Sequence, residues 1–165
     1  MKLDDAKLPD GSIQSIPLGK RSEATYDGIK AKITFEISQI EKLLDSGKPL
    51  FDLCKIKTPD FIEMSAAALL LHSFYNGLEN ILVLIFKHYN KSLPNGIKWH
   101  MELLEQAFTF KEVNKSIFRI ELQEPLDKYL KFRHFIRHSY GFQLEWERME
   151  DLIIESAQSV LRPPV

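Results

Sequence analysis

The stretch MSAAALLLHSFYNGLENILVLIF, residues 64–86, is apolar on nearly every side when it is placed on a helix. A surface helix shows one apolar stripe, whereas a helix that is apolar all round is buried by several neighbours. The preceding letters TPDFIE are typical of a helix start, with Thr58 as the cap and Pro59 preset at the first helical position. We therefore expect a central helix that begins after Thr58 and persists to about Asn90.

The N-terminal part of the chain predicts one long helix before the central one. Apolar residues recur at helical spacing from Ser22, and Gly47 followed by Pro49 is expected to stop the run. The inward positions of this helix are Ile29, Ile33, Ile37, Ile40 and Leu44. Residues 1–21 are polar and broken by Gly and Pro, so we expect a flexible arm there.

Three more helices are expected after the central one. A short helix covers residues 99–109, and a long one begins near Lys115, is kinked by Pro125 and ends in a left-handed Gly141. The inward positions of the long helix and of a last helix are Ile117, Ile120, Leu126, Tyr129, Leu130, Trp146, Met149, Ile153, Ala157 and Val160. No segment alternates as a strand. The predicted fold is all-α, an antiparallel bundle of about five helices that forms a single domain over residues 22–165.

Composition narrows the function classes. A chain of 165 residues with 44% apolar side chains buries one core, and a net charge of −1 gives no global attraction to nucleic acid or membrane. The single cysteine, Cys54, excludes a disulfide framework within the chain, and no Cys/His cluster has metal-binding spacing. Polar residues interrupt the most apolar segment, and the N-terminus lacks a signal core. We expect a cytoplasmic protein without membrane span, metal or cofactor.

A cationic stretch near the C-terminus, KFRHFIRHSYGFQLEW at residues 131–146, contrasts with the near-zero net charge. Its part RHFIRHSY holds two arginines, two histidines and a tyrosine within eight positions. Three interpretations are open. The stretch is the solvated end of a helix whose negative pole attracts cations, a patch that binds phosphate or nucleic acid, or a catalytic site.

Arg133, His138 and Tyr140 are the residues that a catalytic site would use. Cleavage of RNA without a metal ion needs a base for the ribose 2′-hydroxyl, an acid for the leaving oxygen, and a cation beside the phosphorane between them. Histidine and arginine supply these functions. Five residues along an ideal helix, however, turn Arg133 about 140° away from His138. Either the last turn unwinds at Gly141, or two copies of the chain pool their motifs across a two-fold axis.

Glu79 is a charged residue within the most apolar stretch of the chain. If it faces the core, its charge requires a cationic partner. We expect Glu79 to orient Arg133 or His100, the alternative being an exposed glutamate on a rotated face of the helix. For His100 itself, which follows Trp99 near a helix start, capping or packing is the ordinary role.

The motif RHFIRHSY resembles the Arg-x4-His-x-Tyr signature of the HepT-like toxins, a branch of the HEPN superfamily of helical ribonucleases. His134 matches the polar residue that often follows the arginine. The segments LLLHSFYNGLENIL, WHMELL and YGFQLEWERM are similar to HepT-like segments in the same order. The resemblance covers roughly residues 24–160.

This resemblance implies a metal-independent endoribonuclease toxin that acts as a homodimer on RNA. Arg133 and His138 would be the catalytic pair, with His134, Arg137 and Glu79 in support. The resemblance also implies neutralisation by a nucleotidyltransferase antitoxin of the MntA type, with adenylylation of the signature tyrosine, Tyr140. A catalytically silent HEPN module that holds nucleotide or RNA phosphate for a partner enzyme is the alternative, because binding and cleavage use the same residue types.

Overall fold

Helices make up the regular structure of this protein in a computed structural model, which describes residues 18–110 and 117–154. The α-helices in chain order are α1 (Leu18–Cys54), α2 (Phe61–His88), α3 (Trp99–Thr109), α4 (Gln123–His138) and α5 (Glu150–Ile154). Short 3-10 helices cover Ile120–Leu122, Gly141–Gln143 and Trp146–Arg148. No strand occurs in these described ranges. The predicted all-α fold with five helices packed in one body is confirmed.

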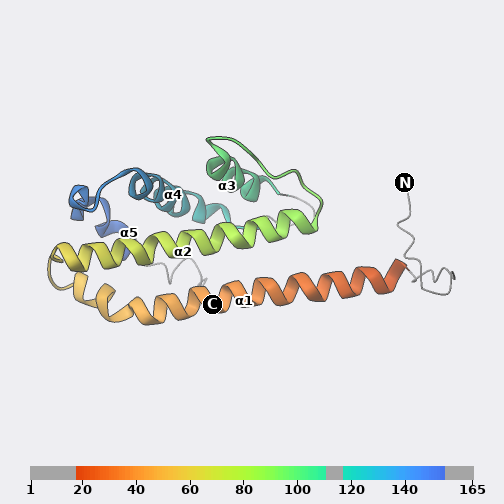
Figure 1. Cartoon of the computed structure of the whole chain (residues 1–165), viewed down its shortest axis with the longest axis horizontal. Coiled ribbons are helices and arrows are strands. Elements are labelled where there is room, and N and C mark those ends of the chain that lie inside the picture. The colour runs from red at the N-terminus through yellow and green to blue at the C-terminus, as the bar shows by residue number, and fades with distance from the viewer. Residues whose placement is uncertain (1–17, 111–116, 155–165) are drawn as a thin grey trace, which may run out of the picture.

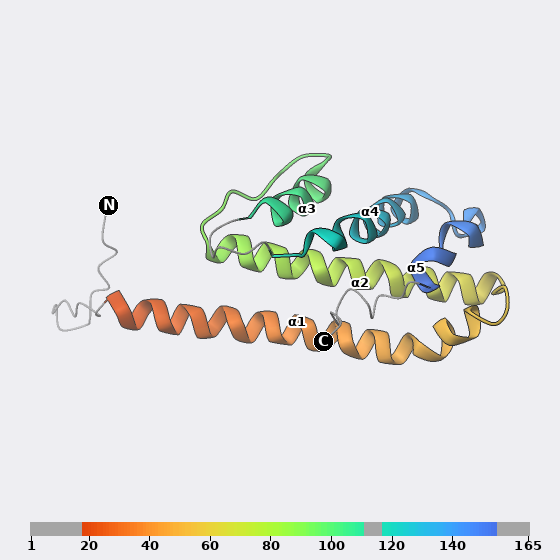
Figure 2. The same ribbon diagram turned by 180° about the vertical axis from the view of Figure 1, so that it is seen from behind.

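The helix α2 is the centre of the bundle. It runs antiparallel to α1 on one side, and α3 and α4 lie along its other side (Figure 1 and Figure 2). Its buried residues come from most of its circumference and are Ala67, Ala68, Leu71, Phe74, Tyr75, Leu78, Glu79, Leu82 and Phe86. By length and composition alone α2 could also cross a bilayer, a test that the core helix of a folded domain passes as well.

The start of α2 lies two residues later than predicted. Asp60, not Thr58, is the N-cap, and its carboxylate accepts hydrogen bonds from the backbone N–H groups of Ile62 and Glu63 at 2.9 Å. The Glu63 side chain in turn accepts from the Asp60 N–H at 2.8 Å, which completes a capping box. Pro59 lies before the cap rather than in the first turn.

The first helix is longer than predicted at both ends. It begins at Leu18, inside the expected arm, and residues 1–17 lie outside the described part of the chain. It also continues through Gly47 and Pro49 to Cys54. Burial accounts for the continuation, because Phe51 and Cys54 beyond the proline are 7% and 4% exposed within the main core. The last turns of α1 bend toward α2 (Figure 1), as a proline inside a helix leads one to expect.

The helix α4 differs from its prediction at both ends. It begins at Gln123, so Pro125 falls in its first turn, where a backbone N–H has no partner within the helix and no kink is needed. It ends at His138, followed by an extended Ser139, and Gly141 lacks the predicted left-handed conformation. The inward positions Leu126, Tyr129 and Leu130 are buried as predicted, whereas Ile120, also predicted to face inward, is 65% exposed in the 3-10 helix before α4.

The last helix is shorter than predicted within the described residues. Trp146 belongs to a 3-10 helix, and α5 begins only at Glu150. Met149 and Ile153 are nevertheless 0% and 1% exposed, as their inward positions predict. Ala157 and Val160 lie outside the described part of the chain.

Candidate functional site

A buried polar cluster joins α2, α3 and α4. Glu79 of α2 is 4% exposed and is the one buried charged residue in the described ranges. Its Oε1 atom lies 2.7 Å from Nδ1 of His100 in α3, and its Oε2 atom lies 3.2 Å from Nε of Arg133 in α4. Arg133 and His100 also meet, with 3.0 Å between Nη1 and Nε2. Glu79 therefore contacts both of the partners that the sequence suggested for it.

Asn76, one turn before Glu79 on α2, completes the cluster. Its side-chain oxygen accepts a hydrogen bond from Nε of Arg133 at 2.8 Å. The side chains of Arg133 and His100 are each 11% exposed, so the guanidinium is largely shielded from water. Its three partners are Asn76, Glu79 and His100. The remaining nitrogen of Arg133, Nη2, makes no hydrogen bond to any residue that the structure describes. It is the part of the guanidinium left for a ligand.

The cluster determines which nitrogen of His100 carries a proton. A guanidinium has only donors, so Nε2 of His100 must accept from Arg133 and must be unprotonated. The proton of the neutral ring is then on Nδ1, where it is donated to Glu79. An imidazolium would turn an N–H toward the guanidinium, so this arrangement is specific for neutral His100.

Burial displaces the pKa values of both titratable groups of the cluster. For His100 the direction agrees with the hydrogen-bond pattern, whereas for Glu79 burial acts against the two donors that face its oxygens. It lowers the pKa of His100 to about 4, with further contributions from the charges of Arg133, Arg137 and His134. It raises the pKa of the Glu79 carboxyl to about 7, although the charges of Arg133 and Arg137 oppose the change. Both groups thus favour their neutral forms more strongly than they do in water.

The exposed half of the candidate site lies on the outer face of the last turns of α4. His134 and His138 are one turn apart, and the centroids of their rings lie 4.7 Å from each other. Both histidines and Arg137 are exposed. Three basic side chains therefore face solvent near the negative pole of the helix, which favours positive charge.

Arg133 and His138 do not face the same way within one chain. The helix remains regular through His138, so the separation of about 140° on an ideal helix applies. Arg133 points into the bundle, where its side chain is only 11% exposed. His138 is exposed and points to solvent. The first expected remedy, an unwound last turn at Gly141, is absent from the described structure. Pooling of motifs between two copies, the second expected remedy, stays a prediction.

Tyr140 follows directly after the end of α4. It has an extended backbone, is 72% exposed, and its N–H donates to the side chain of Gln143 at 2.9 Å. The neighbouring Gly141 packs near Phe61, at the start of α2, since a side-chain carbon built on the glycine would lie 3.6 Å from that ring. The tyrosine is thus exposed to solvent, two residues after His138 in the sequence.

Sequence reasoning assigned no role to two residues of the site, Asn76 and His72. His100 was named as a partner of Glu79 and was otherwise expected to cap or pack, so its contact with Arg133 was not predicted. His72 has its Nδ1 atom buried without a hydrogen-bond partner in the described residues, and burial lowers its pKa. A signal was present, because His72, Asn76 and Glu79 occupy positions i, i+4 and i+7 of an otherwise apolar helix. Such a polar stripe marks the face that α4 covers.

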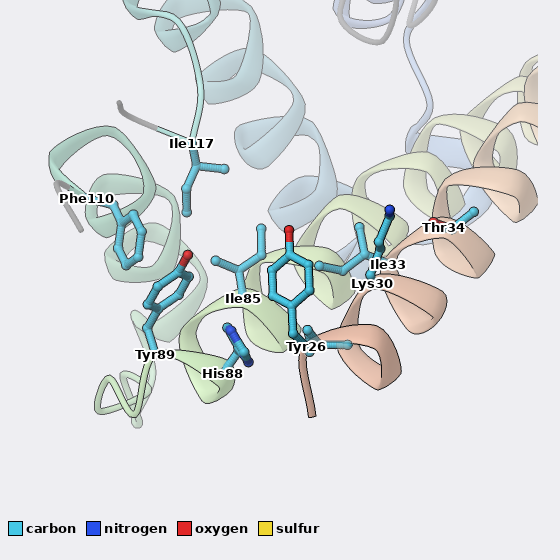
Figure 3. Close-up of a pocket in the computed structure, with 10 residues that line it drawn as sticks. Tyr26, Lys30, Ile33, Thr34, Ile85, His88, Tyr89, Phe110 and Ile117 are labelled. Carbon is cyan, nitrogen blue, oxygen red and sulfur yellow. The ribbon is translucent and has the colours of Figure 1, made fainter. Parts of the chain in front are cut away.

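A separate cavity of about 360 Å³ lies at the other end of the bundle. Figure 3 shows Ile85 of α2 between Tyr26 of α1 and Tyr89, with Phe110 and Ile117 beside them. Its described lining residues include none from α4. No group of three or more His, Cys, Asp or Glu in the described ranges is arranged to hold a metal ion. The cavity is therefore separate from the basic side chains of α4, and it is lined by a histidine and a lysine of its own, His88 and Lys30.

The described residues define an all-helical protein in which one helix, α4, carries a partly buried arginine and several exposed basic side chains. Comparison with known protein families matches residues 66–163 to the family described as HepT-like protein. This span is more than half of the 165 residues, so the chain belongs to the HepT-like family. No curated protein and no solved structure gives a significant match.

Proposed function

We propose that this HepT-like protein is a metal-independent endoribonuclease toxin that acts on RNA in the cytoplasm. The observation that carries the proposal is the C-terminal half of α4, where Glu79, His100 and Asn76 hold the guanidinium of Arg133 and two histidines with ring centroids 4.7 Å apart face solvent on another side of the helix. A fixed cation next to imidazoles is what phosphate transfer requires when no metal supplies the charge.

The residues have separate roles in the proposed reaction. A histidine base takes the proton of a ribose 2′-hydroxyl, whose oxygen then bonds to the adjacent phosphorus. The bond from phosphorus to the 5′-oxygen breaks, and a histidine acid gives that oxygen a proton. His138 serves as acid or base, and Arg133 stabilises the phosphorane charge through Nη2, which makes no hydrogen bond to the described residues. His134 and Arg137 bind the flanking phosphates.

A homodimer supplies the missing juxtaposition of Arg133 and His138. One helix directs these two residues about 140° apart, so the site of a single chain is incomplete. A two-fold axis close to the end of α4 would bring His138 of one copy toward Arg133 of the other. The dimer is thus part of the proposed catalytic arrangement.

Control by a partner enzyme is the last part of the proposal. Tyr140 is 72% exposed, so a nucleotidyltransferase antitoxin of the MntA type can reach it. A nucleoside monophosphate on the Tyr140 hydroxyl would bring a negative charge beside Arg137 and His138 and occupy the place of a substrate phosphate. Adenylylation would therefore neutralise the toxin.

A catalytically silent module is the second candidate, and a specific observation favours it. Within one chain Nε and Nη1 of Arg133 already contact Asn76 and His100, while His138 lies on another face of α4. If copies do not pool their motifs, the exposed cations bind nucleotide or RNA phosphate for a partner enzyme without cleaving it.

Incubation of the purified protein with RNA in excess EDTA tests the proposal. We expect cleavage to persist in EDTA and to fall by about 10²- to 10⁴-fold in His138→Ala, the usual contribution of a general acid or base. His88→Gln, at the cavity end of α2, is the control for loss of one histidine. Intact RNA with retained binding by the wild type would support the silent module instead.

A further inference from the structure

His100 occupies a place in the cluster that the proposed reaction does not yet use. It is the second residue of α3, and its ring lies between Glu79 of α2 and Arg133 of α4. It is the residue of α3 that contacts both of these charged groups in the described structure. A ring that only filled space would need no such pair of hydrogen bonds.

The two nitrogens of His100 have different tasks. Nδ1 donates to Glu79 at 2.7 Å, which fixes the plane and the tautomer of the ring. Nε2 is left with its lone pair directed at Nη1 of Arg133, at 3.0 Å. Asn76 holds Nε of the same guanidinium at 2.8 Å. Two neutral acceptors on different helices therefore determine the plane of the guanidinium, and Glu79 keeps one of them oriented.

We propose that His100 is a positioning residue for Arg133, acting through its unprotonated Nε2 as a hydrogen-bond acceptor oriented by Glu79. The inference rests on the proposed ribonuclease function for its kinetic consequence, but the tautomer and the contact are properties of the resting protein. The orientation matters because a cation aimed at a phosphorane contributes only when its N–H groups meet the developing charge, and displacements of about 1 Å cost up to a hundredfold in rate.

Two substitutions separate the tasks of the two nitrogens. Glutamine places an amide oxygen near the position of Nε2, so His100→Gln retains the acceptor for Arg133. Asparagine places an amide N–H near the position of Nδ1, so His100→Asn retains the donor for Glu79 but loses the acceptor. Both remove the imidazole and leave a neutral polar side chain. A residue with a merely structural role would respond similarly to both.

The kinetic test compares kcat and KM of the two variants with RNA in excess EDTA. We expect His100→Asn to lower kcat by about tenfold to a hundredfold with little change in KM, because the lost interaction serves the transition state. His100→Gln should stay within about threefold of the wild type. Equal losses in the two variants, or a loss confined to KM, would overturn the proposal.

Nuclear magnetic resonance of the wild-type protein tests the contact independently of cleavage. Two-bond correlations between ring hydrogens and ¹⁵N should show His100 protonated on Nδ1 and unprotonated on Nε2 at pH 7. An Nε2–H tautomer or an imidazolium would overturn the proposal even in a protein that cleaves RNA. If the expected tautomer is found but no RNA is cleaved, the proposed function fails while the positioning contact stands.

Discussion

Replacing Glu79 by glutamine should remove a pH dependence of stability that the buried carboxyl introduces. Burial raises its pKa from the ordinary 4.5 to about 7. Between these values the folded chain holds a proton that the unfolded chain has released, so this contribution is full below pH 4.5 and is lost as the pH rises through about 7. At about 1.4 kcal/mol per pKa unit, the loss is ~3 kcal/mol. Glutamine has the same shape and no proton to lose.

Replacing His100 by glutamine should change the pH dependence of the free energy of unfolding in the opposite direction. The pKa of His100 is lowered from its ordinary 6.5 to about 4, so its contribution is full above pH 6.5 and is lost as the pH falls through about 4. The magnitude is again ~3 kcal/mol. In the wild type the two contributions oppose each other between about pH 4.5 and 6.5 and nearly cancel, which hides both of them.

The assay is urea unfolding of wild type and both variants at half-unit steps from pH 4 to pH 8. Subtracting the free energy of unfolding of the wild type from that of each variant removes the contributions of the carboxylates that all three proteins share. The difference curve of Glu79→Gln should rise with pH by ~3 kcal/mol, and that of His100→Gln should fall by a similar amount. Glu105→Gln, at an exposed position of α3, is the control for loss of one carboxylate.

Opposite slopes are the essential result. They follow from the buried positions of Glu79 and His100, and they do not depend on whether the protein cleaves RNA. Two flat difference curves would mean that both groups are solvated in solution, and slopes of equal sign would mean that the proton assignment within the cluster is wrong. Either outcome would refute the reasoning that places a neutral His100 between a carboxyl and a guanidinium.

Four other predictions concern packing, capping, control and assembly. Gly77→Ala brings a carbon to 2.7 Å from Ile40 and should lower the free energy of unfolding in urea by ~1–3 kcal/mol. The added carbon of Gly28→Ala meets nothing within 4 Å, so this substitution should raise the same free energy by up to ~1 kcal/mol. Asp60→Ala removes the α2 cap and should cost ~1 kcal/mol; an unchanged unfolding midpoint would argue against the capping box. Coexpressed with a MntA-type nucleotidyltransferase, the wild type but not Tyr140→Phe should gain nucleotide mass, and equal gains would place the modification elsewhere. Light scattering should report about twice 19.2 kDa, and a strict monomer that cleaves RNA would contradict pooled sites.

The central helix was predictable because its composition leaves few alternatives. A segment that is apolar all round must be surrounded, and α2 is indeed covered by α1, α3 and α4. The bounds of α3 also agree with the prediction, since a loop with Pro and Gly precedes it and its apolar positions are few and regular. Local signals suffice where burial and sequence point to the same boundary.

Boundaries were less predictable where burial competes with a local signal. Pro49 removes one hydrogen bond of α1, but the residues after it, among them Phe51 and Cys54, lie in the core, so continuing the helix is favoured over ending it. Thr58 and Asp60 are both acceptable caps by residue type. Asp60 prevails in the structure, where Glu63 returns a hydrogen bond to it.

The site was only half visible in the sequence, because spacing does not say which face of a helix is inward. Arg133, His138 and Tyr140 could be singled out by spacing, and Glu79 by its apolar surroundings. From α3, His100 was predicted only as one of two alternative partners of Glu79. Its contact with both charged residues was not predicted, since His100 comes 21 residues after Glu79 and 33 before Arg133, and only the packing of three helices brings them together.

The packing of the three helices explains why a separation of about 140° between Arg133 and His138 is useful. A guanidinium that must hold one orientation benefits from buried partners, and Glu79, His100 and Asn76 supply them from two other helices. A histidine that must exchange protons with a substrate benefits from exposure, which the end of α4 provides. Two groups on one face would share one environment and could not meet both needs. The five-residue spacing therefore divides α4 into an anchored and an accessible side, and under the proposed function a second copy would bring the two sides together.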